Sequence, residues 1–313
     1  MRFIMIDRIC RLETGKRALG IKNICRDDVF LTETFPGTLA FSPVILAESA
    51  AQLISWIIIE ARAFSVKPVI ALVDRFVCSG HTVPGDRLLL EGTIESLSEE
   101  SALAHARVTI GTKTILELHH AVCYLYPLEA LDPPDAAHRQ FHELYDEGHP
   151  LPEPSCTEGA VPYLQNSPFK KRIGIDALLP SDDPNHLAGV KNITATEPYF
   201  NDHFPRKPVT PGVIICESMA GLAALLIERE AERLDFGDRL PVLEQCDKMK
   251  FRAFVVPGDQ IVIDAQLREY TKERCTVALK ATVHNKAVTT ALLTFALMNE
   301  NRYQNRYLTH QCV

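Results

Sequence analysis

One pattern occurs twice in this chain, and that internal repeat constrains the fold more than any other feature of the sequence. The segment IKNI at position 21 returns as VKNI at position 190, which is 169 residues later. The same displacement relates three further pairs: Asp7 to Asp176, Phe35-Pro36 to Phe204-Pro205, and Glu48 to Glu217. Because a sustained register of this kind marks repeated structural units, we expect the chain to fold as two similar halves.

Each copy has the same order of expected elements. A strand region leads to a Pro-rich loop, then to one long helix, and then to four runs rich in Val, Ile, Leu and Thr. In the first copy these are 17–25, the helix 43–63, and the runs 68–78, 86–98, 102–110 and 114–126. In the second they are 186–194, the helix 211–233, and the runs 241–254, 259–270, 274–284 and 287–298.

The first expected helix, PVILAESAAQLISWIIIEARAF, is apolar on nearly every face, which is typical of a buried helix. A single buried helix followed by a meander of strands is covered only if the sheet wraps around it. The sequence therefore predicts an α+β fold, a double hot dog with two tandem repeats. The expected boundaries are 1–126 and 172–298 for the repeats, 127–171 for a linker with one short helix within 133–148, and 299–313 for a frayed polar tail.

Composition excludes several classes of protein. Hydrophobic residues make up 46% and charged residues 23% of the 313, as in soluble globular proteins, and the net charge of -7 argues against a general nucleic-acid binder. The nine cysteines are scattered singly, so neither a disulfide framework nor a zinc site is expected. Neither a signal peptide nor an apolar run long enough to cross a membrane is expected, which favours a cytoplasmic protein without a membrane partner.

The stretch YFNDHFPRKPVTPGVIICESMAG, residues 199–221, has an arrangement that suits acid/base chemistry. His203 lies in a loop that Pro205, Pro208 and Pro211 make stiff and non-helical, and Glu217 follows on the apolar helix. A lone histidine in a turn is most often a structural residue. Here, however, a degraded copy of the whole stretch lies upstream, which favours a functional site.

This stretch resembles the motif of the 3-hydroxyacyl-acyl-carrier-protein dehydratases of type II fatty-acid synthesis (FabZ-like), which is close to GHFPxxPxxPGVLxxEAMAQ. The matching residues are His203-Phe204-Pro205, Pro208, Pro211-Gly212-Val213, Glu217, Met219 and Ala220. With the first copy included, the resemblance covers most of the chain except linker and tail. In that family two hot dog subunits associate, and each active site takes its His from one subunit and its Glu from the other.

In a fused pair, the resemblance implies one complete and one incomplete site. The complete site combines His203 as base, Glu48 as acid, the backbone N–H of Gly212, and Gln52, with Phe204 also contacting substrate. The reciprocal site would combine Thr34, Pro43, Glu217 and Gly221 where the family has His, Gly, Glu and Gln. Thr34 is no base near neutral pH and Pro43 has no N–H to offer an oxyanion, so this second site should be inert.

The expected reaction is removal of water from a 3-hydroxyacyl thioester to give the trans-2-enoyl form, in fatty-acid synthesis or a specialised acyl-chain or polyketide pathway. Its mechanism requires neither metal nor organic cofactor. The expected partner is an acyl carrier protein bearing the substrate, or a CoA thioester, and the fused pair can assemble further into a homo-oligomer. The basic residues Lys170-Lys171-Arg172, Arg206 and Lys207 form either a solvated face or a docking site for an acidic carrier.

Alternative interpretations stay open at this point. Other hot dog enzymes hydrate CoA thioesters or hydrolyse thioesters, and a half-degenerate chain is also compatible with a non-catalytic acyl-binding or scaffold subunit. Glu217 is interpreted as a structural hydrogen-bonding residue in preference to a backup acid. His81, His119, His120 and Asp202 are interpreted as solvated or interface residues and not as ligands. Asp202 replaces the family's Gly, and its charge is expected to raise the pKa of His203 or to restrict the loop.

Overall fold

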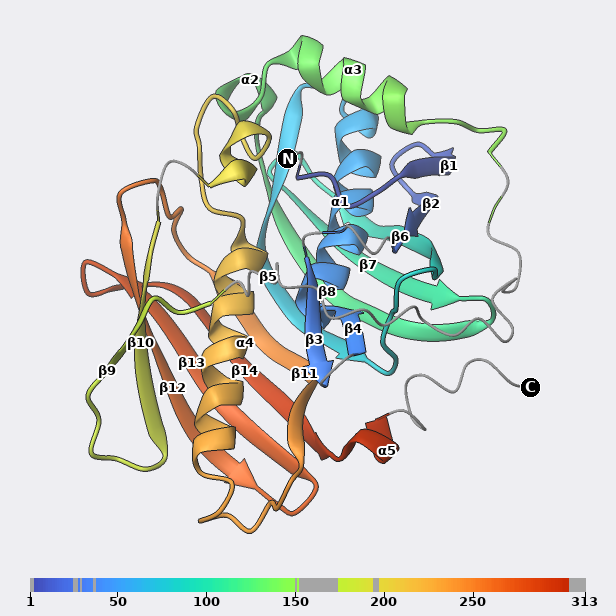
Figure 1. Ribbon diagram of the computed structural model, residues 1–313. Helices are drawn as coiled ribbons and strands as arrows, with labels where there is room; N and C mark the ends of the chain where they lie inside the picture. The colour runs from blue at the N-terminus through green and yellow to red at the C-terminus, as the bar shows by residue number, and fades with distance from the viewer. Residues whose placement is uncertain are drawn as a thin grey trace.

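The computed structural model of the protein describes residues 3–24, 28, 30–35, 38–149, 151, 174–193 and 197–303. Two long helices lie on the same side of one continuous sheet (Figure 1). The first repeat contains β1 (Arg8–Glu13), β2 (Arg17–Asn23), β3 (Leu31–Phe35), β4 (Thr38–Phe41), α1 (Pro43–Ala61), β5 (Val66–Cys78), β6 (Arg87–Leu97), β7 (Ser101–Ile110) and β8 (Lys113–Pro127). The connecting segment contains α2 (Leu128–Leu131) and α3 (Pro134–Leu144).

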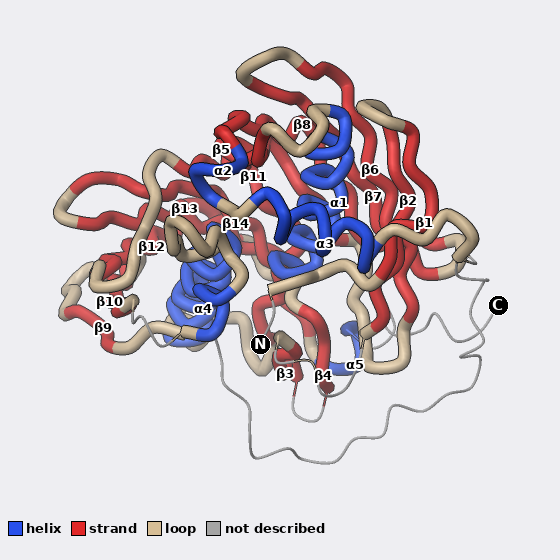
Figure 2. Tube along the Cα trace, turned by 90° about the horizontal axis from the view of Figure 1, so that it is seen from above, coloured by secondary structure: helices blue, strands red, loops and turns tan. Residues whose placement is uncertain are grey.

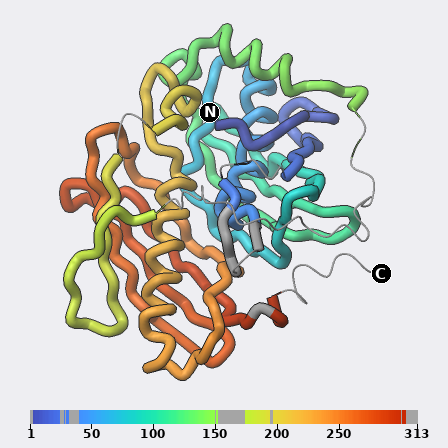
Figure 3. Tube along the Cα trace, viewed as in Figure 1, coloured from blue at the N-terminus to red at the C-terminus, as the bar shows by residue number. Residues whose placement is uncertain are grey.

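The second repeat follows the same order. It contains β9 (Ala177–Leu179), β10 (His186–Asn192), the 3-10 helix η1 (Pro198–Asn201), α4 (Gly212–Arg229), β11 (Leu240–Phe251), β12 (Gln260–Tyr270), β13 (Arg274–Val283), β14 (Lys286–Met298) and α5 (Glu300–Tyr303). Figure 3 shows the blue-to-green first repeat and the yellow-to-red second repeat side by side. The expected double hot dog fold is confirmed, because each repeat wraps an antiparallel sheet around one long helix.

The strand order makes the relation between the repeats explicit. The twelve-stranded sheet runs β1-β2-β6-β7-β8-β5-β11-β14-β13-β12-β10-β9, so that the two halves are mirror images in strand order about the β5–β11 pair. This central pair is antiparallel, with Phe76 opposite Cys246 and Val73 opposite Met249. Backbone hydrogen bonds therefore join the repeats edge to edge, and neither β5 nor β11 is left as an open edge.

Helix α1 packs inside the curved sheet of the first repeat. Ser42 caps it by accepting a hydrogen bond from the Val44 N–H at 3.3 Å, and Pro43 occupies the first helical position, where no N–H is needed. The helix has the length and composition of a membrane span, but 72% of its most apolar window is buried inside this fold. Its apolar character is thus explained by burial against β2, β5, β6 and β7.

Equivalent turns in the two repeats follow from one repeated triplet, Pro-Gly-Asp. Gly85 has a φ of 104° and Gly258 a φ of 93°, a region that residues with a Cβ rarely adopt. The aspartate after each glycine closes its turn, because Asp86 accepts from the Val83 N–H at 2.8 Å and Asp259 from the Val256 N–H at 2.9 Å.

Some expected elements differ in the structure. The Pro-rich loop of the first repeat contains a hairpin, β3–β4, which pairs in its own small sheet. The expected linker holds α3 near its start, and residues 150 and 152–173 lie outside the described part of the chain. The tail begins with α5, and the side chain of its Tyr303 is fully buried. The start of the tail is therefore packed on the fold and not frayed as expected. Figure 2, seen from above, shows α3 running across the end of α1.

Candidate active site

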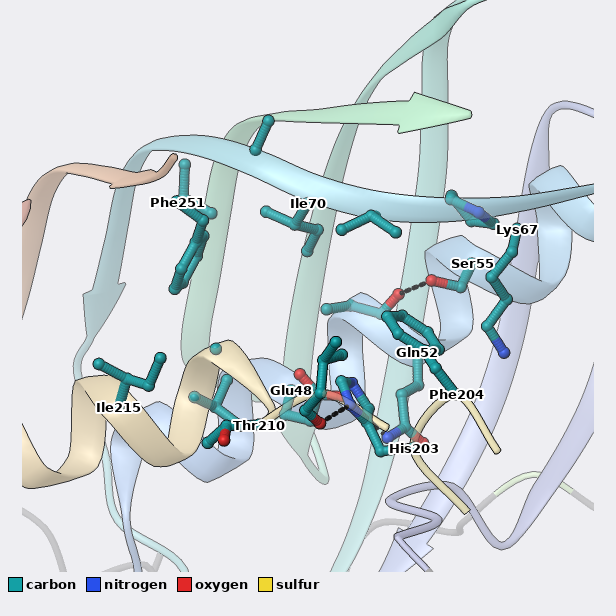
Figure 4. Close-up of a pocket in the computed structure, with 18 of the residues that line it drawn as sticks. Glu48, Gln52, Ser55, Lys67, Ile70, His203, Phe204, Thr210, Ile215 and Phe251 are labelled. Atoms are coloured by element: carbon teal, nitrogen blue, oxygen red, sulfur yellow. Dashed lines mark hydrogen bonds between the residues drawn. The ribbon is translucent and has the colours of Figure 1, made fainter. Parts of the chain in front are cut away.

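A cavity of about 380 Å³ lies between the two long helices and takes side chains from both repeats. His203, Phe204 and Gly212 line it from the second repeat, and Glu48 and Gln52 line it from the first. Figure 4 shows the labelled side chains directed toward this common space. All five residues that the sequence predicted for the complete site therefore meet at one cavity.

The loop after η1 fixes the imidazole of His203. Its backbone N–H donates to the Tyr199 carbonyl at 2.8 Å, and its Nδ1 lies 2.8 Å from the Val209 carbonyl oxygen. A carbonyl only accepts, so Nδ1 carries the hydrogen and Nε2 keeps a lone pair. Burial lowers the pKa of His203 to about 4, although the Val209 hydrogen bond opposes the shift. The imidazole is consequently neutral at cellular pH and can accept a proton at Nε2.

Phe204 turns the chain immediately after His203. Its φ of 57° is unusual for a residue with a side chain, and its ring stacks on His203 with centroids 4.2 Å apart. The ring is buried with Leu131 and Val209. In the next residues, the Arg206 N–H donates to the Leu131 carbonyl at 3.0 Å. Helix α2, which follows the first repeat, thus holds the loop of the second repeat that carries His203.

Glu48 and Gln52 lie one turn apart on α1 and are hydrogen bonded to each other. The Gln52 Nε2 donates to Glu48 Oε1 at 2.9 Å and to the Phe3 carbonyl at 3.3 Å, while Gln52 Oε1 accepts from the Met5 N–H at 2.8 Å. Loss of solvation raises the pKa of Glu48 to about 7, with the Gln52 hydrogen bond and the positive charge of Lys67 acting in the opposite direction. A carboxyl with this pKa retains a proton to donate near neutrality.

Gly212 is the first residue of α4, and the helix N-terminus opens at the cavity. The first N–H groups of a helix have no acceptor within it and carry partial positive charge, which suits a developing oxyanion. The position requires glycine because an added Cβ would lie 2.6 Å from a ring carbon of Phe251. The close packing explains why the sequence has Gly here, and any residue except proline would supply the N–H donor.

The N-terminal segment contributes a wall of the cavity that sequence reasoning missed. The Phe3 ring meets His203 edge to face with centroids 5.6 Å apart and lines the cavity. The Phe3 N–H donates to Asp202 Oδ2 at 3.1 Å. The expectation that Asp202 raises the pKa of His203 is wrong, because burial lowers that pKa and the Asp202 carboxylate is bonded to Phe3. The apolar residues at the chain start gave no sign of this contact.

Lys67 is a second residue that the sequence did not single out. It lines the cavity from β5, forms an ion pair with Asp132 at 2.6 Å, and lies 5.6 Å above the Phe204 ring centroid. Its charge opposes the rise in the pKa of Glu48 and adds to the lowering of the pKa of His203. Only the folded chain could reveal it, since Lys67 lies in a strand away from every motif.

The residues of the reciprocal site are arranged differently. The Ser42 hydroxyl donates to the Glu217 carboxylate, and loss of solvation raises the pKa of Glu217 to about 7. Pro43 is the first residue of α1, and Gly221 is exposed to solvent. Neither Glu217 nor Gly221 lines the large cavity. The Thr34 side chain lies outside the described part of the structure.

The other histidines and basic residues that the sequence analysis singled out have different surroundings. His81 is buried, with its ring 5.0 Å from that of Tyr303, so the expectation of a solvated side chain is wrong for it. His119 and His120 lie on the outer face of the sheet. Arg206 and Lys207 are exposed beside the His203 loop, and the Lys207 Nζ lies 4.7 Å from the Phe254 ring centroid. Lys170-Lys171-Arg172 lie outside the described residues.

Fold and cavity together define a double hot dog protein with a neutral imidazole and a high-pKa carboxyl facing one apolar chamber. A family model of the FabA-like domain matches residues 1–119 and 176–291, so that both repeats are included. The chain belongs to this FabA-like family, and the expected relation to dehydratases is confirmed.

Individual relatives agree with the family match. The chain is 39% identical over 128 residues to the 3-hydroxyacyl-[acyl-carrier-protein] dehydratase FabZ of Streptococcus mutans, covering 40% of this chain and 86% of that protein. It is 40% identical over 116 residues to the FabZ of Streptococcus pneumoniae, covering 36% of this chain and 79% of that one. Each of these relatives thus corresponds to less than half of the fused chain.

Solved structures reproduce the whole double fold. The dehydratase domain of PpsC from Mycobacterium tuberculosis, solved in complex with C12:1-CoA, superposes with a TM-score of 0.55 at 13% identity, covering 95% of this chain and all of that one. A MaoC-like dehydratase superposes with a TM-score of 0.51 at 11% identity, covering 91% and 98% of the two chains. At such identities the likeness concerns the fold alone.

Proposed function

We propose that this chain dehydrates 3-hydroxyacyl thioesters to trans-2-enoyl thioesters at one composite site, with His203 as base and Glu48 as acid. The observation that carries the proposal is the shared cavity, in which a neutral imidazole from one repeat faces a high-pKa carboxyl from the other. The relatives named as 3-hydroxyacyl-acyl-carrier-protein dehydratases support the reaction class.

The base acts on the carbon next to the thioester carbonyl. His203 Nε2 removes a proton from C2, and the electron pair forms the new double bond between C2 and C3. The negative charge that develops on the thioester oxygen is stabilised by the N–H groups at the start of α4, beginning with Gly212. Because Nδ1 is held by the Val209 carbonyl, the ring cannot rotate away when Nε2 takes the proton.

The acid completes the elimination. A hydroxyl on C3 is a poor leaving group until it is protonated, so Glu48 donates its proton and water departs. Gln52 holds the carboxyl through Oε1, and Phe3 and Met5 hold Gln52 in turn. The products are an enoyl thioester and water, with the imidazole protonated and the carboxyl ionised. Solvent exchange restores both groups, and hydration of an enoyl thioester uses the same steps in reverse.

The second carboxyl has a structural task in this proposal. Glu217 accepts the Ser42 hydroxyl, and Ser42 also caps α1 through the Val44 N–H. A buried acid that ties the start of α1 to α4 strengthens the contact between the repeats. The fusion therefore gives one working site for each chain.

The substrate carrier proposed is an acyl carrier protein. Arg206 and Lys207 are exposed beside the loop that bears His203, and Arg252 is exposed at the cavity lining. Positive residues around the cavity suit an acidic carrier surface and accelerate its encounter with the enzyme. A CoA thioester with the same acyl chain should react at the same site without using the docking contacts.

Turnover of the purified chain tests the proposal. We expect conversion of a 3-hydroxyacyl thioester to the enoyl product, followed by mass spectrometry, with higher kcat/KM for the carrier-bound substrate than for the CoA form. His203→Ala and Glu48→Gln should each lower kcat by roughly 10²–10⁴-fold, the usual contribution of a positioned acid or base.

The matched control for Glu48→Gln is Glu217→Gln, the same change at the equivalent position of the other repeat. It should keep kcat within about threefold of the parent chain, because Gln can still accept the Ser42 hydroxyl. Equal losses in the two Gln variants would reject the composite site. Hydrolysis of the thioester without an enoyl product would instead indicate a thioesterase.

A further inference from the structure

A cluster of imidazole and carboxylate groups lies on the outer face of the first repeat's sheet, away from α1. Glu95 on β6, His105 on β7 and His120 on β8 each offer a donor atom, and these atoms lie within 4.8 Å of one another. Along β7, the alanines at 104 and 106 are buried while His105 between them is not, which places it on the opposite face from the core. We call Glu95, His105 and His120 the outer cluster.

Irregularities in two adjacent strand pairs bring these side chains together. Between β7 and β8, Ala104 pairs with Ala121 and Ala106 with Leu118, so that His119 and His120 both stand opposite the single residue His105. Between β6 and β7, the pairing skips Glu95. Such β-bulges redirect side chains and are enriched next to functional sites. The bulges here direct groups from three neighbouring strands to one point.

The geometry within the outer cluster is tight. His105 Nε2 lies 2.5 Å from Glu95 Oε2, and the rings of His105 and His120 lie 4.8 Å apart between centroids. A fourth group is close, because His120 Nδ1 lies 3.6 Å from Asp74 Oδ2 on β5. The backbone of His120 has a φ of 50°, an uncommon conformation for a residue with a side chain.

The second repeat provides an internal comparison. There β13 and β14 pair without interruption at the equivalent place, with Ala278 opposite Leu292 and Val277 opposite Leu293. Arg268 occupies the skipped position of β12 that corresponds to Glu95. The β12–β13 pair thus keeps the bulge seen between β6 and β7. The β13–β14 pair lacks both the two histidines and the bulge seen between β7 and β8. The outer cluster is a feature of the first repeat and not of the fold.

We propose that the outer cluster binds one divalent transition-metal ion such as Zn²⁺. Imidazole nitrogen and carboxylate oxygen are ligands that this class of ion prefers, and Asp74 or water can complete four-coordination. Tetrahedral ligands at about 2.1 Å from the ion lie about 3.4 Å from one another. Donor atoms already within 4.8 Å reach that spacing through small side-chain rotations.

The site is separate from the proposed acyl-thioester chemistry. The ion would connect β5, β6, β7 and β8 on the surface of the sheet, while the cavity lies on the face that packs on α1. Its expected effect is on the stability of the first repeat, because an ion that binds the folded chain and not the unfolded one raises the melting temperature. The sequence suggested solvated histidines here, since a bulge cannot be recognised from the order of residues alone.

Calorimetric titration of the chelator-treated full chain with Zn²⁺ near neutral pH tests the proposal. We expect one ion at the outer cluster with a dissociation constant in the micromolar range or tighter, and a rise in melting temperature with Zn²⁺. His105→Ala and His120→Ala should each weaken this binding about tenfold or more, because even a residue that only supports a ligand is worth roughly 10- to 100-fold in metal affinity.

The matched control is His142→Ala, which removes an exposed histidine of α3 outside the outer cluster and should leave binding unchanged. Circular dichroism of each variant shows whether the fold is retained, and Glu95→Gln gives a second, milder test of the same site. Wild-type protein that takes up no Zn²⁺ at about 100 µM, or cluster variants that bind Zn²⁺ as the parent does, would show that the outer cluster is a surface ion pair only.

Discussion

At the scale of single residues, the environment of the site reverses the order in which an imidazole and a carboxyl lose their protons in water. Removal from solvent lowers the pKa of His203 to about 4 and raises that of Glu48 to about 7. In the proposed mechanism the imidazole can therefore act as base and the carboxyl as acid over the whole interval between these values. Fully solvated, the two residue types titrate in the opposite order, because a free carboxyl loses its proton at about pH 4.3 and a free imidazolium at about pH 6.5.

The pH dependence of kcat/KM follows from these two groups. As pH falls through about 4, His203 becomes protonated and loses its function as a base; as pH rises through about 7, Glu48 loses the proton it must donate. We expect a bell-shaped profile with its two limbs at these values, measured with a CoA thioester across buffers of constant ionic strength.

A substitution at Lys67 tests which carboxyl causes the loss of activity on the alkaline side of the pH profile. Its charge lowers the pKa of Glu48, so Lys67→Met should move that limb to higher pH, whereas Glu217→Gln should leave it in place. An alkaline limb that responds to Glu217→Gln and not to Lys67→Met would mean that the wrong carboxyl had been assigned as the acid.

At the scale of elements, the N-terminal segment completes the cavity. Phe3 packs against the His203 ring, its carbonyl accepts from Gln52, and its N–H donates to Asp202. Asp202 is one of the positions at which this sequence departs from the motif it resembles, which has glycine there. The acidic side chain thus provides an anchor that glycine lacks.

Removal of the Asp202 carboxylate should loosen the N-terminal segment where it lines the cavity. A hydrogen bond to a charged acceptor contributes about 1.5–3 kcal/mol, so Asp202→Gly should lower kcat/KM by about tenfold or more and speed amide exchange in the segment around Phe3 to Ile6. Asp202→Asn keeps an acceptor oxygen and serves as the control, with kcat/KM within about threefold of the parent. Higher activity of Asp202→Gly would show that the carboxylate hinders the reaction.

At the scale of the whole molecule, the β5–β11 pair makes two repeats into one sheet. Phe76 opposite Cys246 and Val73 opposite Met249 continue the backbone ladder across the junction, and α1 packs on α4 beside it. The proposed site needs a residue from each side of this junction. Activity should therefore depend on the pairing of the repeats and not on either one alone.

A divided chain tests this dependence. If the chain is cut between residues 149 and 174 and the two parts are co-expressed, we expect them to copurify with kcat within about tenfold of the intact protein, because the junction keeps its backbone pairing. Each part expressed alone should be inactive. Turnover by the second part alone would contradict the requirement for Glu48.

Much of this organisation could be predicted from the order of residues. The repeat, the two apolar helices and the strand meander follow from local periodicity, and the match of His203, Glu48, Gly212 and Gln52 to one motif follows from spacing. What escaped prediction depends on contacts between distant segments. The position of Phe3, the entry of Lys67 into the cavity, the burial of His81 and the bulge at His119-His120 arise only when strands and termini meet.

The hydrogen bond from Ser42 to Glu217 shows what fusion permits. In a symmetric homodimer every substitution is made twice, so a change that helps one pocket also alters its twin. Here the two repeats have different sequences, and in the proposed arrangement the pocket around Glu217 does not have to bind substrate. The Glu217 carboxyl then ties the two helices together, and residues around it can change without altering the cavity that His203 and Glu48 share.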